Sequence, residues 1–392
     1  MNALTIDLED YYMVSAFEGV VNRHQWDRFT PRIEQNTYRL LDMLDECSPP
    51  RRATGSVDEG NDSTSCHRTG TKATFFCLGW VAERHPGLIR EINSRGHEIA
   101  SHGYDHRMIT NMSGAEEFRQ DVRRSKMILE DLCGQRVYGY RAPSYSITCR
   151  TLWAPRVLIE EGFQYDSSIF PVHHDRYGIP DAPRSPFLLS VDASRGGEGM
   201  PRTNAPSSSG FWTSAESCGY SVSALQFYPN ARHCDCYRGS LQKDERAARE
   251  PGSFVFPSLP SGTLLEFPLS TLRVLGYNLP VAGGGYFRLF PLGFTLWVLQ
   301  REQKASSEPF VFYIHPWEID PDQPRVGGVP FGYRFRHYLN LEKSEKRMRR
   351  LAKEVMFTSF FQFLMGSEVK PVSWTADFGR NDAWVTSNPG AC

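Results

Sequence analysis

The chain has 392 residues, of which 40% are hydrophobic and 23% are charged, and its formal net charge is −1. This balance is typical of a packed globular protein and gives no electrostatic basis for nucleic-acid binding. The sequence has no apolar run of the roughly 18 residues that a transmembrane helix needs. It begins without a basic and apolar leader, and its nine cysteines have no framework spacing. We therefore expect a cytoplasmic protein with reduced thiols.

Strand-like apolar runs alternate with segments of helical period along the chain. In chain order the predictions are strand 4–6, helix 34–46, strand 72–78, helix 79–95, strand 96–100, helix 115–132, strand 137–141, helix 150–162, strands 164–168, 264–268 and 309–314, and helix 341–363. Repeated β/α units of this kind predict an α/β fold with a mainly parallel sheet or barrel.

Two segments interrupt this pattern. Residues 48–70 and 192–260 have no sustained period, and the second is rich in Gly, Ser, Pro and Arg. Loops of this length and composition favour disorder. We therefore predict a single domain over residues 1–369 with these two irregular insertions, followed by a mobile tail over residues 370–392.

Two histidines, His102 and His106, stand four residues apart in the sequence Ser-His-Gly-Tyr-Asp-His. They follow the predicted strand 96–100, and enzymes with alternating β/α units place their chemistry at the carboxyl ends of strands. Neutral imidazoles suit divalent zinc, cobalt or nickel, and the third ligand is normally a carboxylate. The pair alone also fits a surface turn that carries two histidines by chance.

Three further fragments carry residues suited to hydrolysis. The acids Asp7, Glu9 and Asp10 follow the first strand, where they could supply a metal ligand and a base. Arg141 lies in Tyr-Arg-Ala-Pro, and His315 follows the last predicted strand and precedes a proline. Each fragment alone has an ordinary explanation, as solvated turn acids, a salt-bridge arginine or a buried histidine.

Together and in this order, the four fragments resemble the polysaccharide deacetylases of the NodB-homology type (carbohydrate esterase family 4). Residues 5–9 resemble that family's acid motif, and the two histidines resemble its His-x-x-x-His metal motif. Arg141 with Pro143 resembles its Arg-x-Pro motif, and His315 with the preceding isoleucine resembles its Leu-x-His motif. The subgroup associated with exosortase and exopolysaccharide gene clusters is the most similar, on residues 7–11, 79–86, 280–288 and 315–318.

This resemblance implies a distorted (β/α) barrel of about seven strands, as a NodB-like member of the α/β class. It implies a metal-dependent hydrolase that removes N-acetyl groups from amino-sugar residues of a polysaccharide, such as an exopolysaccharide or its precursor. We expect an N-acetylated polysaccharide or oligosaccharide as the partner, no nucleic acid, and a peripheral association with exopolysaccharide assembly machinery.

The resemblance also implies the metal ligands. His102 and His106 would bind a divalent metal, with zinc expected first and cobalt or nickel as alternatives. The family's second aspartate is Leu8 in this sequence, which cannot bind metal. Glu9 or Asp10 must then be the third ligand. An acid two residues after the base favours Glu9, whereas Asp10 has the more usual side chain.

The same resemblance implies the residues that move protons. Asp7 would be the general base that takes a proton from water, held ionised by Arg141. His315 would be the general acid that protonates the leaving amine. Asp166, in the predicted strand 164–168, would orient His315 and raise its pKa.

Substrate contacts are expected from backbone N–H groups and from aromatic side chains. The N–H groups around Ser144 and Tyr145 would contact the oxyanion. Trp317 and Tyr286 would stack on sugar faces, and core packing is the alternative for both rings.

Two other functions are compatible with these motifs. The first is a degenerate carbohydrate-binding protein on the same scaffold, in which Leu8 and Ser144 mark a lost activity. The second is a hydrolase of small cyclic or linear amides, against which the Gly-Gly-Gly-Tyr stretch 283–286 argues.

Overall fold

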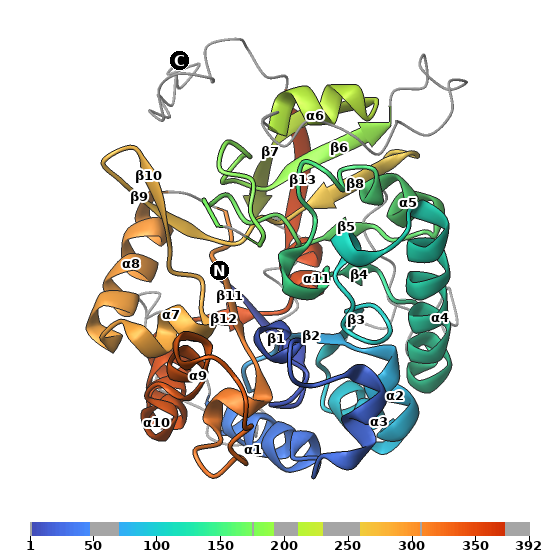
Figure 1. The fold of residues 1–392 in the computed structure, drawn as a ribbon. Coiled ribbons are helices and arrows are strands. Elements are labelled where there is room, and N and C mark those ends of the chain that lie inside the picture. Colours follow the sequence, from blue (N-terminus) through green and yellow to red (C-terminus); the bar gives the residue numbers. More distant parts are fainter. Residues whose placement is uncertain are drawn as a thin grey trace, which may run out of the picture.

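The computed structural model describes residues 2–47, 70–174, 176–191, 211–229, 259–305 and 308–372. The parallel strands of its main sheet are β1 (Asn2–Leu8), β2 (Thr74–Cys77), β3 (Glu98–Ser101), β4 (Gly139–Tyr140), β5 (Tyr165–Asp166), β8 (Thr263–Glu266) and β11 (Val311–Ile314). They lie side by side in the order β11-β1-β2-β3-β4-β5-β8. This parallel arrangement confirms the prediction of an α/β fold (Figure 1).

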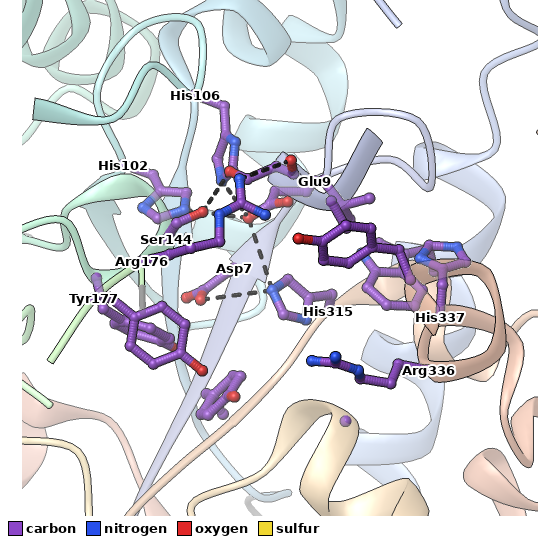
Figure 2. Close-up of a pocket in the computed structure, with 18 of the residues that line it drawn as sticks. Asp7, Glu9, His102, His106, Ser144, Arg176, Tyr177, His315, Arg336 and His337 are labelled. Carbon is purple, nitrogen blue, oxygen red and sulfur yellow. Dashed lines mark hydrogen bonds and ion pairs between the residues drawn. The ribbon is translucent and has the colours of Figure 1, made fainter. Parts of the chain in front are cut away.

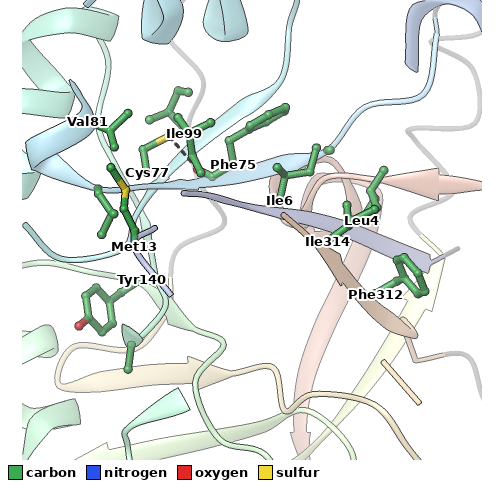
Figure 3. Packing of buried hydrophobic residues seen from close by; sticks show 14 of the residues in the cluster. Leu4, Ile6, Met13, Phe75, Cys77, Val81, Ile99, Tyr140, Phe312 and Ile314 are labelled. Carbon is green, nitrogen blue, oxygen red and sulfur yellow. Dashed lines mark hydrogen bonds between the residues drawn. The ribbon is translucent and has the colours of Figure 1, made fainter. Parts of the chain in front are cut away.

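Strand β1 explains how one sheet serves both the core and the site. All seven of its residues are buried, as is typical of a strand in a parallel sheet. Side chains alternate along a strand, so Leu4, Ile6 and Leu8 share one face and pack in the main hydrophobic cluster (Figure 3). Thr5 and Asp7 lie on the other face, where both accept hydrogen bonds from an arginine.

The helices between β1 and β5 lie along the outer side of the sheet (Figure 1). They are α1 (Ile33–Glu46), α2 (Gly79–Arg84), α3 (Pro86–Ser94), α4 (Ala115–Cys133) and α5 (Ala154–Glu160). The predicted helix 79–95 is therefore two helices. The break falls at His85, because the residue before a proline is disfavoured in the helical region, and Pro86 is well suited to start the next helix.

The chain that follows β8 lies against the free edge of β11. Ser270 Oγ accepts a hydrogen bond from Val311 N at 2.8 Å, and Ala282 O accepts one from Tyr313 N, also at 2.8 Å. These contacts bring the two ends of the parallel segment toward one another. No β-ladder joins β8 to β11 among the described residues, so the closed barrel stays a prediction.

An antiparallel extension continues the sheet beyond β8. It consists of β6 (Phe187–Val191), β7 (Tyr220–Pro229) and β13 (Ser367–Val372), with α6 (Phe211–Ser217) beside it. The prediction that 192–260 is irregular is wrong for residues 211–229, and the predicted tail begins too early, because 370–372 belong to β13. The composition of this segment does not indicate that Phe211 is packed in the core, where the centre of its buried ring lies 5.4 Å from that of Phe187. The insertion 48–70, except its last residue, and residues 373–392 lie outside the described residues.

The predicted helix 341–363 is also wrong. The chain there forms α10 (Leu341–Glu354), the short strand β12 (Phe357–Thr358) beside β1, and α11 (Phe360–Met365). Helix α11 starts anew because Ser359 Oγ accepts a hydrogen bond from Gln362 N.

The elements between β8 and α10, apart from β11, are β9 (Thr271–Val274), β10 (Tyr277–Pro280), α7 (Gly284–Leu289), α8 (Leu292–Ala305) and α9 (Phe331–Tyr338). They lie together on one side of the sheet (Figure 1). Within the described ranges, every helix is too short or too polar to cross a membrane.

Candidate functional site

Two carboxylates stand at the carboxyl end of β1. The N–H of Glu9 donates to the carbonyl oxygen of Asp7 at 2.9 Å, so the chain turns sharply as the strand ends. Asp7 and Glu9 both line one pocket, and Leu8 between them is fully buried in the hydrophobic core. The leucine therefore has a packing role at this position, and the acids on either side of it face the site (Figure 2).

Glu9, His102 and His106 form a buried cluster of three metal-binding side chains. Glu9 Oε1 lies 3.2 Å from His102 Nε2 and 3.1 Å from His106 Nε2. The possible ligand atoms of all three residues are within 4.8 Å of one another. Gly103, with φ of +74°, makes the turn between the histidines, and a Cβ at this position would lie 2.8 Å from Asp121 Oδ2.

The hydrogen bonds of His102 show that this cluster fits a cation. His102 Nδ1 lies 2.8 Å from the carbonyl oxygen of Arg141, which can only accept, so Nδ1 carries the proton. In the neutral ring Nε2 then has a lone pair directed at Glu9 Oε1, which is also an acceptor. A divalent cation bound by Glu9 and both histidines satisfies these facing acceptors, and two imidazoles with one carboxylate are a common zinc ligand set.

Glu9 is suited to this position as a carboxylate. Burial alone would raise the pKa of Glu9, but the positive charges of the neighbouring His106 and His315 hold it well below its ordinary value. The side chain therefore stays ionised over the whole physiological range.

Asp10 has a different role. Its Oδ2 accepts hydrogen bonds from the N–H groups of Arg32 at 2.7 Å and Ile33 at 3.0 Å, at the start of α1. Its Oδ1 accepts from Tyr11 N at 2.9 Å. Asp10 therefore fixes the N-terminus of a helix and is outside the cluster, and this geometry favours Glu9 as the candidate for the third ligand.

Arg141 holds Asp7 in place, as the sequence predicts. The Nη1 of Arg141 donates to Asp7 Oδ1 at 2.7 Å and to Thr5 Oγ1 at 2.8 Å. Its Nε and Nη2 donate to the backbone and side chain of Ser167. The arginine is fully buried, so its ion pair with Asp7 lies in a site with little solvent screening.

The prediction that Asp166 orients His315 is wrong. Asp166 is buried behind Arg141, where its Oδ1 accepts a hydrogen bond from Ser168 Oγ. Ser168 Oγ in turn accepts from Ala142 N at 2.8 Å. Burial raises the pKa of Asp166 to about 6. Asp166 thus supports the backbone that carries Arg141, and within the described part of the chain it makes no hydrogen bond or ion pair with His315.

Glu318 has the role that the family resemblance predicts for Asp166. His315 Nδ1 lies 2.7 Å from Glu318 Oε1, in the short helical turn Pro316–Ile319 that follows β11. His315 Nε2 points to the acids, 3.7 Å from Glu9 Oε1 and 3.8 Å from Asp7 Oδ2. Burial would lower the pKa of His315, but the charges of Glu9, Glu318 and Asp7 and the bond to Glu318 raise it to about 9. His315 is therefore protonated at neutral pH.

Arg288 completes this arrangement from the end of α7. Its Nε donates to Glu318 Oε2 at 2.7 Å, and its Nη1 donates to three backbone carbonyl groups between residues 336 and 339. Glu318 is fully buried, so this ion pair fixes both its charge and its direction. The sequence does contain a signal for Glu318, which stands three residues after His315, but it has none that links Arg288 to it.

A pocket of about 300 Å³ opens over these groups. Trp317 and Tyr145 line it, although both are largely buried, and the Trp317 ring stacks on that of His337 at 4.2 Å. The N–H of Tyr145 donates to Ala142 O, so it is already occupied and does not fit the predicted oxyanion contact. Tyr286 is not among the lining residues of this pocket, so the predicted sugar contact of that ring is not supported. The structure instead adds Tyr177, Tyr313 and Tyr333 to the lining.

Comparison with known proteins confirms the resemblance for one part of the chain. Residues 66–158 match the polysaccharide deacetylase family, and residues 240–365 match a domain of unknown function (DUF3473). The first match includes His102, His106 and Arg141. The exosortase-associated subgroup is not established by either match.

Among curated proteins, the chain is 35% identical over 63 residues to a peptidoglycan-N-acetylglucosamine deacetylase of Listeria monocytogenes, covering 16% of this chain and 14% of the relative. It is 33% identical over 104 residues to the peptidoglycan deacetylase of Helicobacter pylori, covering 26% of this chain and 33% of the relative. The chain therefore spans a third or less of the length of these relatives.

A crystal structure from Mycobacterium smegmatis, itself a proposed polysaccharide deacetylase, is 17% identical with a TM-score of 0.45, and the match covers 93% of this chain and 88% of that one.

Proposed function

We propose that this protein is a metal-dependent deacetylase that removes N-acetyl groups from amino-sugar residues of a polysaccharide. The observation that carries the proposal is the buried cluster of Glu9, His102 and His106, in which Glu9 Oε1 lies 3.2 Å from His102 Nε2 and 3.1 Å from His106 Nε2. An arginine-paired carboxylate, Asp7, and a protonated histidine, His315, stand at the same pocket. A ligand set, a base and an acid together are what amide hydrolysis requires.

A divalent cation held by Glu9, His102 and His106 would polarise the acetamide carbonyl and lower the pKa of water. The ligand types suit zinc first, with cobalt or nickel as alternatives. Asp7 pairs with Arg141 through Oδ1 and accepts the proton of the attacking water on Oδ2, which makes no bond to the arginine. His315 donates its Nε2 proton to the leaving nitrogen, and Glu318 stabilises the charged ring before that transfer.

The named activities of the relatives support an amino-sugar polymer as the substrate. They are described as deacetylases of peptidoglycan N-acetylglucosamine and, in Azorhizobium caulinodans, of chitooligosaccharide. We therefore infer that the substrate is an N-acetylated oligosaccharide or polysaccharide, specifically an exopolysaccharide. We also infer that the fold is a NodB-like barrel. Cytoplasmic location and association with exopolysaccharide assembly machinery stay predictions.

Acetate release from a panel of substrates tests this function. We expect the zinc-loaded protein to release acetate from chitohexaose or from N-acetylated peptidoglycan glycan chains, and to leave allantoin and simple acetamides unchanged. Tight zinc binding without acetate from any sugar would instead support a degenerate carbohydrate-binding protein. Turnover of the small amides alone would support the second alternative.

The Glu318→Gln substitution tests the acid. The reaction requires protonated His315, so the rate falls as pH rises through the pKa of that histidine. Removing the negative charge of Glu318 lowers this pKa, and the alkaline limb of the pH–rate profile should move to lower pH by roughly one unit or more. A cation bound by Glu9 would offset part of that residue's charge in both proteins, so the shift between them is the quantity to measure.

The exposed Glu342, on α10, offers a matched control as Glu342→Gln. An alkaline limb that is identical in wild type and Glu318→Gln would show that His315 does not set it.

A further inference from the structure

The outer wall of the pocket carries positive charge that the proposed reaction does not use. Arg176, from the segment before β6, and Arg336, from α9, both line the pocket. Figure 2 shows both side chains directed into it, with His315 between them in this view. The acids that line the pocket are Asp7 and Glu9, and both belong to the groups already described at its floor.

Neither of these arginines is neutralised within the part of the chain that the structure describes. Arg176 Nη2 donates to the carbonyl oxygen of Ser15 at 3.1 Å, and no ion pair is formed by Arg176 or Arg336 with a described carboxylate. The buried arginines of the site differ, because Arg141 pairs with Asp7 and Arg288 with Glu318.

Both guanidinium groups lie near the same tyrosine ring. The Cζ of Arg176 is 5.9 Å from the centre of the Tyr333 ring, and the Cζ of Arg336 is 5.8 Å from the same centre. Two cations at one pocket, neither paired with a described carboxylate, create a positive potential that favours an anion there. A guanidinium presents two parallel N–H donors whose spacing matches the two oxygens of a carboxylate.

We propose that Arg176 and Arg336 bind a carboxylate carried by the polymer, on a sugar next to the N-acetylated residue. This inference rests on the proposed deacetylase function and specifies its substrate class as an acidic, N-acetylated glycan. The carboxylate has two chemical sources, a uronic acid in the chain or a lactyl ether on an amino sugar. Both present the same group to the arginines.

Binding measured without turnover tests this proposal. Zinc-loaded protein carrying Asp7→Asn is titrated by calorimetry with neutral chitohexaose, with a hyaluronan hexasaccharide as the uronate probe, and with a peptide-free peptidoglycan hexasaccharide as the lactyl probe. At least one acidic probe should bind roughly tenfold more tightly than chitohexaose, and added salt should weaken only the acidic probes. The probe that binds more tightly identifies the source of the carboxylate.

When introduced into the Asp7→Asn protein, Arg176→Gln and Arg336→Gln should each weaken binding of the preferred acidic probe by roughly 5–10-fold. The affinity for chitohexaose should stay unchanged. Arg334→Gln is the matched control, since Arg334 is an exposed arginine of the same helix that does not line the pocket. Equal affinity for neutral and acidic probes, or an equal loss for both, would overturn the proposal. Absence of acetate release by the wild type would count against the deacetylase function alone, because these affinities need no turnover.

Discussion

The Asp7→Asn protein is expected to release acetate roughly 10²–10⁴-fold more slowly than wild type while it keeps its metal. Asparagine has the same shape as aspartate, so its side-chain oxygen can still accept the 2.7 Å hydrogen bond from Arg141 Nη1. It cannot accept the proton of water. The measurement is the rate of acetate release at saturating oligosaccharide, together with the zinc content of the same sample.

Asp27→Asn is the control for this substitution, because Asp27 is largely exposed and pairs with Arg84 at the surface. A thermal melt of both variants is needed as well, since Asp7→Asn leaves the buried Arg141 without a charged partner. An unchanged rate in a folded, zinc-loaded Asp7→Asn protein would show that the base lies elsewhere. Loss of zinc would instead make Asp7 a ligand.

His102→Ala and His106→Ala should each abolish stoichiometric metal binding. Removing one of three protein ligands loosens a metal site by several kcal/mol and opens it to water. Zinc content after gel filtration, measured by elemental analysis, checks this expectation. Full occupancy in either variant would contradict the assignment of the cluster.

His315→Ala is an informative comparison, because Asp7, Glu9 and His315 form a second group of potential ligands within 4.8 Å of one another. If the metal is held by Glu9, His102 and His106, the His315→Ala protein keeps its zinc and loses rate. Loss of zinc in His315→Ala, with retention in His102→Ala, would move the metal to the second group.

Much of the site could be predicted because its residues stand at the ends of strands with a regular β/α spacing. The alternation of β1 places Asp7 beside the site and Leu8 in the core, which explains how an apolar residue fits between two functional acids. The choice between Glu9 and Asp10 could not be made from the sequence. It depends on hydrogen bonds from Arg32 and Ile33, more than 20 residues away along the chain.

The error over Asp166 has a different origin. Asp166 is a buried carboxyl group near the site, but it bonds to Ser168, which holds the backbone beside Arg141. Asp166 therefore supports Arg141 and does not orient His315. The partner of His315 is Glu318, only three residues later in the sequence, whereas the family resemblance points to an aspartate in another strand. Composition misled in a similar way for residues 211–229, where buried aromatic residues such as Phe211 and Phe227 stand in a segment rich in small and polar residues.

Acetate release by the purified wild type, with and without a chelator, tests the central claim most directly. We expect about one zinc per chain and release of acetate from an N-acetylated oligosaccharide. The release should stop when the metal is removed and return when zinc is added back. Acetate release that continues at the full rate in metal-free protein would contradict the account.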